Sequence, residues 1–404
     1  MKKYVILILS VLIQICLGIG YSWSTFVPAL KQDFGLTITQ TQTIFGTGSL
    51  IVTLCIFAGG RIQDRLGPRI PVLVGGIIFS SSYILAGYSS GSYHALLFLI
   101  GFCAAIGVGI SYICPIVCAV KWFPRHKSLA AGIVVAGYGG SPIIVSLIGE
   151  YLLSHQMTVL DIFKYMGLVF LIIVTIAAMF LQNPPQEEDY KPIAADIKTT
   201  DLLKDRNFWG LLCGMFPCLC IGLMTIGNIK PFGLSLNLSL MVTGTAVSAL
   251  AFFNAIGRIG WGIIGGFLEG KKAILLSLIS TAMVCLAAAF AVKDDLTFFL
   301  FVVFAGINYG ACMVLYAAEI ANHYGTEKMG TIYSTLFLSN GVAGFLAPPL
   351  AGRIFDNTGS YSHAFLIFGS LAFISIFLFY FIYQPAKLNN EQNRDSGGCD
   401  MERE

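Results

Sequence analysis

Residues 239–265 read SLMVTGTAVSALAFFNAIGRIGWGIIG, a stretch of 27 residues in which Arg258 is the only ionisable side chain. A helix of this length crosses the hydrocarbon core of a bilayer, which is about 30 Å thick. An arginine in the middle of such a helix costs at least about 2.5–3.5 kcal/mol, so it normally faces a bundle interior or a water-filled path. The stretch therefore predicts a transmembrane helix with a buried anion site at Arg258. The alternative is a structural arginine that bonds helix-end carbonyls or extends to the membrane interface.

The composition of the whole chain indicates an integral membrane protein. Hydrophobic residues make up 56% of the 404 residues and charged residues 11%, and the mean hydropathy is +0.80. A soluble domain would carry about a quarter charged residues. Twelve apolar segments of spanning length are expected, at 4–29, 41–60, 70–90, 94–119, 128–152, 161–182, 207–229, 240–267, 273–292, 296–322, 329–351 and 362–384. The first could be taken for a signal peptide, but it is too long, and eleven more spans follow it.

The distribution of basic residues predicts the orientation. The termini and the alternate connections beginning with 61–69 hold 18 of the 24 lysines and arginines, and the other side has only Lys31, Lys164, Lys230, Lys293 and Arg353. Since basic loops stay in the cytoplasm, both termini are expected there, in the inner (plasma) membrane. The net charge of +3 belongs to these loops and gives no indication of a nucleic-acid partner. The eleven cysteines show no metal-binding or redox spacing.

The chain contains an internal repeat of about half its length. Residues 60–69 (GRIQDRLGPR) end the second predicted helix, and residues 262–272 (GIIGGFLEGKK) end the eighth, 202 residues later. We therefore expect an all-α fold with two pseudo-symmetric halves of six helices each. The predicted units are residues 1–182, a cytoplasmic linker at 183–206, residues 207–386 and a polar cytoplasmic tail at 387–404.

Six plus six helices with a parallel repeat and a glycine-rich basic turn resemble the major facilitator superfamily. The turn matches the superfamily pattern G-x-x-x-D-R-x-G-x-R through Gly60, Asp64, Arg65, Gly67 and Arg69. The resemblance implies that Asp64, Arg65 and Arg69 form a gating turn that holds the two halves together in outward-facing states. A purely structural helix connection is the alternative. The second copy of the turn has Gly266 where the aspartate would stand.

A narrower resemblance lies in Tyr21-Ser22-Trp23-Ser24 and in residues 121–125 (KWFPR) running into 131–139 (AGIVVAGYG). These stretches are similar to the oxalate:formate antiporter family and the neighbouring monocarboxylate transporters. The resemblance implies that Arg258 is the carboxylate-binding arginine, with Asn254 where the monocarboxylate transporters have an aspartate. Asn340 stands where the antiporters have a second cation, a lysine. One guanidinium forms a bidentate pair with one carboxylate, so a monocarboxylate fits better than the dianion oxalate.

Other polar residues in apolar helices are candidates for the substrate site or for gating. Tyr112 and Tyr309 lie in glycine-rich segments that border the central cavity in the superfamily, although interhelical hydrogen bonds would also explain them. Glu319, near the cytoplasmic end of its segment, is expected to act as a gate or helix-end partner that pairs with basic residues of the 4–5 or 10–11 loop, rather than as a proton carrier. Glu150, near the outer end of its segment, is a second residue of this kind.

These observations predict a secondary transporter of a small organic monocarboxylate such as lactate, pyruvate or formate, working by alternating access and by proton symport. The alternatives are an antiporter of the oxalate:formate type and a sensor that binds carboxylate without moving it. An enzyme is disfavoured, because no H-E-x-x-H, phosphate loop or Ser/His/Asp grouping stands at membrane depth. No cofactor, metal or catalytic residue is expected, and the expected partners are the small carboxylate, protons and the lipid around a monomer.

Overall fold

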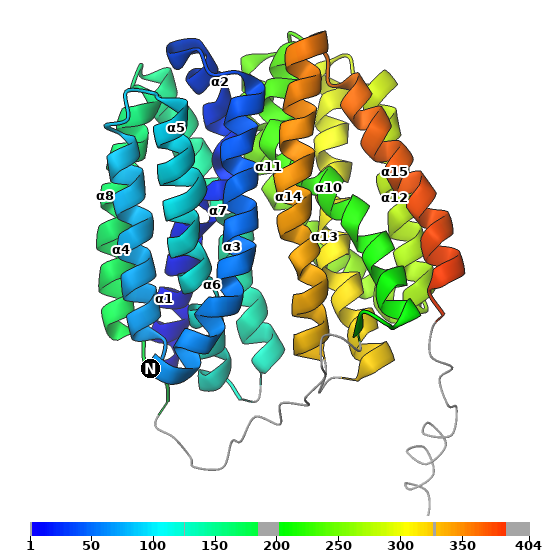
Figure 1. Ribbon diagram of the computed structural model, residues 1–404, viewed down its shortest axis with the longest axis horizontal. Helices are drawn as coiled ribbons and strands as arrows, with labels where there is room; N and C mark the ends of the chain where they lie inside the picture. The colour runs from blue at the N-terminus through cyan, green and yellow to red at the C-terminus, as the bar shows by residue number, and fades with distance from the viewer. Residues whose placement is uncertain (1, 125, 185–201, 326–328, 385–404) are drawn as a thin grey trace, which may run out of the picture.

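The computed structural model is a bundle of long helices, and it describes residues 2–124, 126–184, 202–325 and 329–384 (Figure 1). In the first half, α1, η1 and α2 form one continuous span, and α5, η2 and α6 form another. The elements of this half are α1 (Lys2–Leu17), η1 (Gly18–Ser22), α2 (Trp23–Phe34), α3 (Ile38–Leu66), α4 (Arg69–Ala86), α5 (Tyr93–Leu96), η2 (Leu97–Ala104), α6 (Ala105–Trp122), α7 (Lys127–Ser154) and α8 (Val159–Phe180).

The second half repeats the helices of the first. It contains α10 (Arg206–Ser235), α11 (Leu240–Phe267), α12 (Gly270–Phe290), α13 (Asp295–Tyr324), α14 (Met329–Thr358) and α15 (Ser362–Ile382). Helix α14 begins 202 residues after α7, which agrees with the offset of the sequence repeat. The predicted end of the seventh span at residue 229 is wrong, because α10 continues to Ser235.

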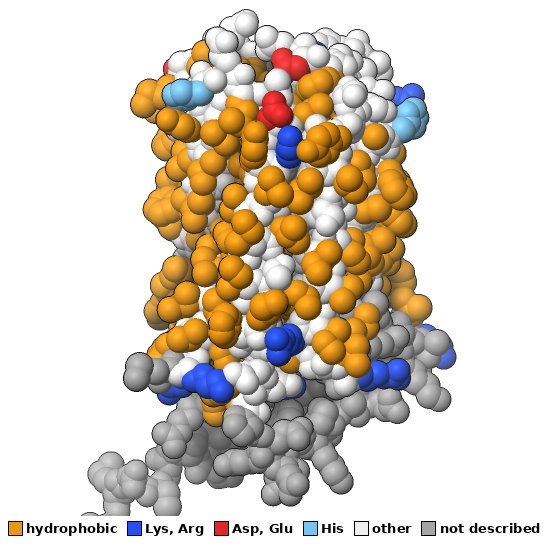
Figure 2. Space-filling view, turned by 90° about the vertical axis from the view of Figure 1, so that its left-hand side faces the viewer, with side chains coloured by type: hydrophobic (Ala, Val, Ile, Leu, Met, Phe, Trp, Pro, Cys, Tyr) orange, Lys and Arg blue, Asp and Glu red, His pale blue; other side chains and the backbone are white. Residues whose placement is uncertain are grey.

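The fold is that of an integral membrane protein. Among the described residues, ten helical runs are long and apolar enough to cross a membrane. Helices α3 and α14 stand at the other two predicted spans and have 29 and 30 residues, enough for about 30 Å. Figure 2 shows hydrophobic side chains covering most of the height of one face, with charged groups toward its two ends.

The first helix begins and the last helix ends on the same side of the bundle. Helix α1 begins and α15 ends at the lower end of the bundle in Figure 1. We call this the terminal end and the opposite one the distal end. The turn between α3 and α4 lies at the terminal end, where Gly67 has a φ of 73° and its N–H donates to the Gln63 carbonyl at 2.8 Å. This left-handed backbone explains why the turn motif has a glycine at position 67.

The two halves contact each other through α3 with α14 and through α7 with α11. Small residues allow the backbones to approach, since a Cβ added to Gly46 of α3 would lie 2.6 Å from the Gly344 carbonyl oxygen of α14. At the distal end, the Asp356 carboxylate of α14 accepts hydrogen bonds from the first N–H groups of α3, those of Ile38 and Thr39, at 3.1 and 2.8 Å. A carboxylate there satisfies otherwise unpaired donors at a helix N-terminus. The distal end is therefore closed by contacts between the halves.

Candidate functional site

Arg258 lies half-buried on α11, and Asn254 holds it in place. The two residues are four positions apart and share one helix face, and the Arg258 Nε–H donates to Asn254 Oδ1 at 2.9 Å. Asn254 is itself buried. Because this hydrogen bond uses Nε, a carboxylate would be gripped by the two terminal NH2 groups of the guanidinium. Asn254 thus fixes the orientation of the arginine and leaves its charge uncompensated.

Two glycines on neighbouring helices make room for Arg258. A Cβ at Gly139 of α7 would lie 3.5 Å from Nη2 and 3.9 Å from Nη1, so the guanidinium rests over a glycine of the opposite half. A Cβ at Gly310 of α13 would lie 2.6 Å from two backbone atoms of α11, the Arg258 nitrogen and the Asn254 carbonyl oxygen. Helices α11 and α13 therefore approach at backbone distance, as small residues permit in membranes. Only glycine fits at position 310, because a side chain there would meet the α11 backbone that carries Arg258.

Tyrosines from both halves pack together beside Gly139, the glycine that lies against the guanidinium. Tyr138 of α7 packs edge-on against Tyr21 and Tyr112, with ring centroids 5.2 and 5.0 Å apart. The Tyr21 hydroxyl lies 3.5 Å from the Tyr309 hydroxyl of α13 and so joins the halves. Phenol hydroxyls can donate to the oxygens of a bound carboxylate.

The position of Tyr21 depends on an irregular turn in the first span. Residues Gly18–Ser22 form a 3-10 segment between α1 and α2. A Cβ at Gly18 would lie 2.4 Å from the Tyr138 carbonyl oxygen, so this segment lies directly against α7. A 3-10 stretch within a long helix often marks a functional hinge.

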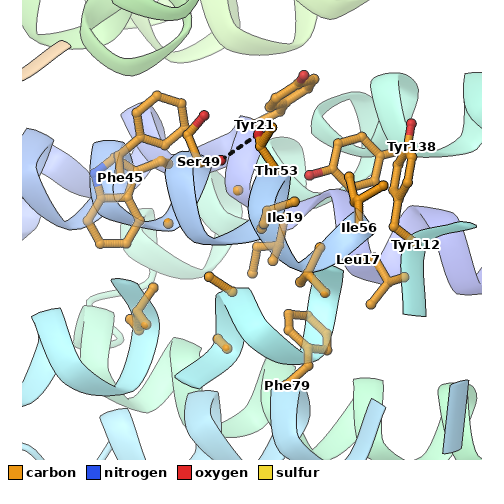
Figure 3. A pocket seen from close by; sticks show the side chains of 18 of the residues that line it. Leu17, Ile19, Tyr21, Phe45, Ser49, Thr53, Ile56, Phe79, Tyr112 and Tyr138 are labelled. Atoms are coloured by element: carbon orange, nitrogen blue, oxygen red, sulfur yellow. Dashed lines mark hydrogen bonds between the residues drawn. The ribbon is translucent and has the colours of Figure 1, made fainter. Parts of the chain in front are cut away.

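A cavity of about 100 Å³ adjoins the tyrosines (Figure 3). One water needs roughly 10–15 Å³ on this measure, so the cavity has room for several waters or a small organic acid. Its polar wall includes Tyr21, Tyr112, Tyr138 and, from α14, Asn340. The other lining residues are mostly apolar, among them Leu17, Ile19, Phe45, Ile56 and Phe79. Arg258 is not among the residues that line this cavity.

Comparison with known proteins places this architecture in a family. The family model described as Major Facilitator Superfamily matches residues 8–348 and 221–398. The chain belongs to the major facilitator superfamily. It is 28% identical over 389 residues to the oxalate:formate antiporter of Oxalobacter formigenes, covering 94% of this chain and 91% of that protein. It is 24% identical to monocarboxylate transporter 12 of Mus musculus, covering 88% of this chain and 80% of the relative.

A solved structure has the same fold. The crystal structure of a bacterial homologue of the human lysosomal transporter Spinster, inward-facing and occupied, superposes with a TM-score of 0.76. The two chains are 17% identical, and the match covers 94% of this chain and 98% of the other. At this identity the likeness concerns the fold alone. The predicted major facilitator fold is confirmed by these matches.

Four of the predicted site residues form two linked pairs. Arg258 donates to Asn254, and Tyr112 is linked to Tyr309 through the rings of Tyr138 and Tyr21. Asn340 lines the adjoining cavity, and its buried Oδ1 has no hydrogen-bond partner among the described residues. The amide oxygen is therefore able to accept a hydrogen bond from a polar group in the cavity.

The predicted gating residues lie elsewhere, toward the terminal end. Arg65 and Arg69 are exposed at the α3–α4 turn, and the side chain of Asp64 lies outside what the structure describes. Glu319 is buried on α13, ten residues or about 15 Å beyond Tyr309. The partner found for it is the Tyr383 hydroxyl, which donates to Oε1 at 2.5 Å. Burial, followed by this contact, raises the pKa of Tyr383 above its usual range and keeps it a donor.

Sequence reasoning missed a second cation between the halves. Lys230 was assigned to a distal loop because the seventh span was ended too early, but it lies inside α10 and is 8% exposed. Its ammonium pairs with Glu150 of α7. The described part of the bundle therefore holds a buried cation, Lys230, besides Arg258. A lysine directly before Pro231 in an otherwise apolar run was the signal that could have revealed it.

Proposed function

We propose that this chain is a secondary transporter of a small organic monocarboxylate, of the lactate, pyruvate or formate type, and that Arg258 binds the carboxylate. One observation carries the proposal. A cation stands at the contact between the two halves, its Nε–H is held by an amide, and its terminal NH2 groups lie against Gly139 of the opposite half. A bidentate pair with a carboxylate offsets the cost of keeping that charge within the membrane. The names of the relatives support small carboxylates as the substrate class.

A single negative charge suits the site better than two. Asn340 is neutral, and Lys230 already has a carboxylate partner. Glu150, that partner, is eleven residues from Gly139 along α7, or roughly 16 Å, and so is remote from the guanidinium. The second carboxylate of a short dianion would therefore lie uncompensated among tyrosines and apolar side chains, which is unfavourable.

For coupling, we propose proton symport in which the proton travels with the bound carboxylate or through water beside Arg258. The hydrogen-bond partner of the guanidinium among the described residues is an amide, and the nearby site residues with hydroxyls are phenols; neither type titrates near neutral pH. Carboxylate exchange is the alternative, which the antiporter relative favours. A carboxylate sensor with a transporter fold is the other alternative, and it would bind without moving the anion.

The proposal includes the placement of the chain. Both termini face the cytoplasm of an inner (plasma) membrane, because the basic loops lie at the terminal end. Residues 1–182 and 207–386 move as two bodies linked by 183–206, and the protein works as a monomer. Asp64, Arg65, Arg69 and Glu319 act at the terminal gate. Of these units, residues 185–201 and the tail 387–404 lie outside the described residues.

Labelled-substrate uptake into proteoliposomes tests the function. Lactate, pyruvate, formate and oxalate are each offered with and without a pH gradient, and with and without internal carboxylate. We expect uptake of a monocarboxylate, driven by an inward proton gradient into empty vesicles. Uptake only into carboxylate-loaded vesicles would favour exchange, and saturable binding without uptake would favour the sensor. A chain that neither binds nor moves any carboxylate contradicts the proposal.

A further inference from the structure

Lys230 is a buried cation, and the partners of its side chain among the described residues belong to the opposite half of the protein. The ammonium on α10 donates to Glu150 Oε1 of α7 and to the Thr25 carbonyl oxygen of α2, the latter at 3.2 Å. The Lys230 backbone N–H donates to Ser24 Oγ of α2 at 3.0 Å. Both α2 and α7 lie in the first half, whereas α10 begins the second. The charge is therefore compensated only while the halves touch at the distal end.

The backbone around Lys230 is also built for contact across the halves. Pro231 has no N–H, so it cannot bond the Gly227 carbonyl one turn earlier. That carbonyl instead accepts from Gln42 Nε2 of α3 at 2.7 Å. On the other side of Glu150, a Cβ at Gly244 of α11 would lie 3.6 Å from Oε2. The ion pair thus sits in a seam between α2, α7, α10 and α11.

Alternating access requires this seam to part. When the distal side opens, Glu150 and the Thr25 carbonyl both move away from the ammonium. A lysine left without a partner on a membrane helix is unfavourable, and an anion entering from the open side can replace the lost carboxylate. A charge-assisted hydrogen bond to that anion is the strong kind of contact.

We infer that Lys230 is a second carboxylate-binding site, the first that a substrate meets on entering from the distal side, and that Glu150 occupies it when this side is closed. The inference rests on the proposed function, and it assigns the same small carboxylate to both cations. Glu150 lies roughly 16 Å along α7 from Gly139, which packs against Arg258. A small acid therefore occupies the two sites in sequence, and Lys230 does not supply the second charge that a dianion needs at Arg258.

The competing explanation is that the Lys230–Glu150 pair is a gate that binds no substrate anion. The two explanations predict different directions for the change in the distal-side KM of the two variants. If the pair only holds the halves together, Lys230→Gln and Glu150→Gln each break it and change transport in the same direction. If Lys230 binds substrate, the first variant removes the site, whereas the second removes its competitor and leaves the cation. The two variants should then move the distal-side KM in opposite directions.

Uptake kinetics in right-side-out and inside-out membrane vesicles provide the test, with the best transported carboxylate as the probe. We expect Lys230→Gln to raise the KM about tenfold in right-side-out vesicles, the loss of about one charge-assisted contact, and less than about twofold in inside-out vesicles. Glu150→Gln should lower the right-side-out KM. Lys230→Arg, which keeps the charge, should restore most of the affinity. Lys293→Gln, which removes an exposed distal lysine, is the matched control and should leave KM unchanged.

The outcomes separate the inference from the proposed function. Equal shifts in the same direction for Lys230→Gln and Glu150→Gln, or an unchanged right-side-out KM for Lys230→Gln, would overturn the Lys230 site. Arg258→Gln is assayed in the same vesicles and should abolish uptake from both sides. If that variant transported normally while Lys230→Gln lost distal affinity, the Arg258 anchor would fall and the Lys230 site would stand.

Discussion

Replacing Arg258 tests the centre of the proposed mechanism. Since Asn254 already takes the Nε–H, the substrate is held by the two terminal NH2 groups. Lysine keeps the charge but offers a single ammonium in place of the planar pair, so it loses about one charge-assisted hydrogen bond, worth about 1.5–3 kcal/mol. Glutamine loses the charge and both contacts, about 3–4 kcal/mol, which corresponds to a hundred- to thousandfold weaker binding.

The assay measures equilibrium binding in detergent and uptake in proteoliposomes for Arg258→Lys, Arg258→Gln and wild type. Thermal unfolding and the inserted yield serve as the control for folding. We expect these to change little, because the hydrogen bond that the Arg258 side chain makes within the described part of the chain is the one to the Asn254 amide oxygen. Wild-type affinity and uptake in Arg258→Gln would refute the assignment of the arginine as the anchor.

Three further predictions follow from the site. Asn254→Asp places a carboxylate about where the amide oxygen lies, 2.9 Å from Arg258 Nε, so this carboxylate should compete with the substrate. Lactate affinity of the variant, measured from pH 5 to 8, should improve toward low pH, where the new carboxylate is protonated. The affinity of wild type should follow only the titration of lactate itself. Asn340→Lys should raise the affinity for oxalate relative to lactate in competition assays, and an unchanged ratio would mean that the amide faces away from the substrate. Gly310→Val should lower both uptake and thermal stability, since a Cβ there would lie 2.6 Å from the backbone nitrogen of Arg258. Gly260→Ala is the control and should behave as wild type, because a Cβ at that position meets no atom within 4 Å.

The candidate site was only partly accessible to sequence reasoning. Arg258 stood out because an ionisable residue in a long apolar helix is rare, and Asn254 followed from its spacing on the same helix face. Tyr138 could not be separated from the other tyrosines, since composition does not say which aromatic rings meet. Lys230 was misplaced because the predicted span ends just before this lysine, whereas a carboxylate on another helix can hold its charge inside.

The sequence by itself determined the membrane setting, the repeat with its offset of 202 residues, and the helix that carries Arg258. These properties depend on hydropathy and on motifs local to the chain, because the bilayer imposes helix length and backbone pairing within each segment. Only the tertiary structure decided which charges lie together. The Lys230–Glu150 pair spans 80 residues and the Asp356 contacts with α3 span more than 300, and they arise where one half packs against the other. No local pattern encodes such contacts, since their stability depends on the burial and partner that the packed halves supply.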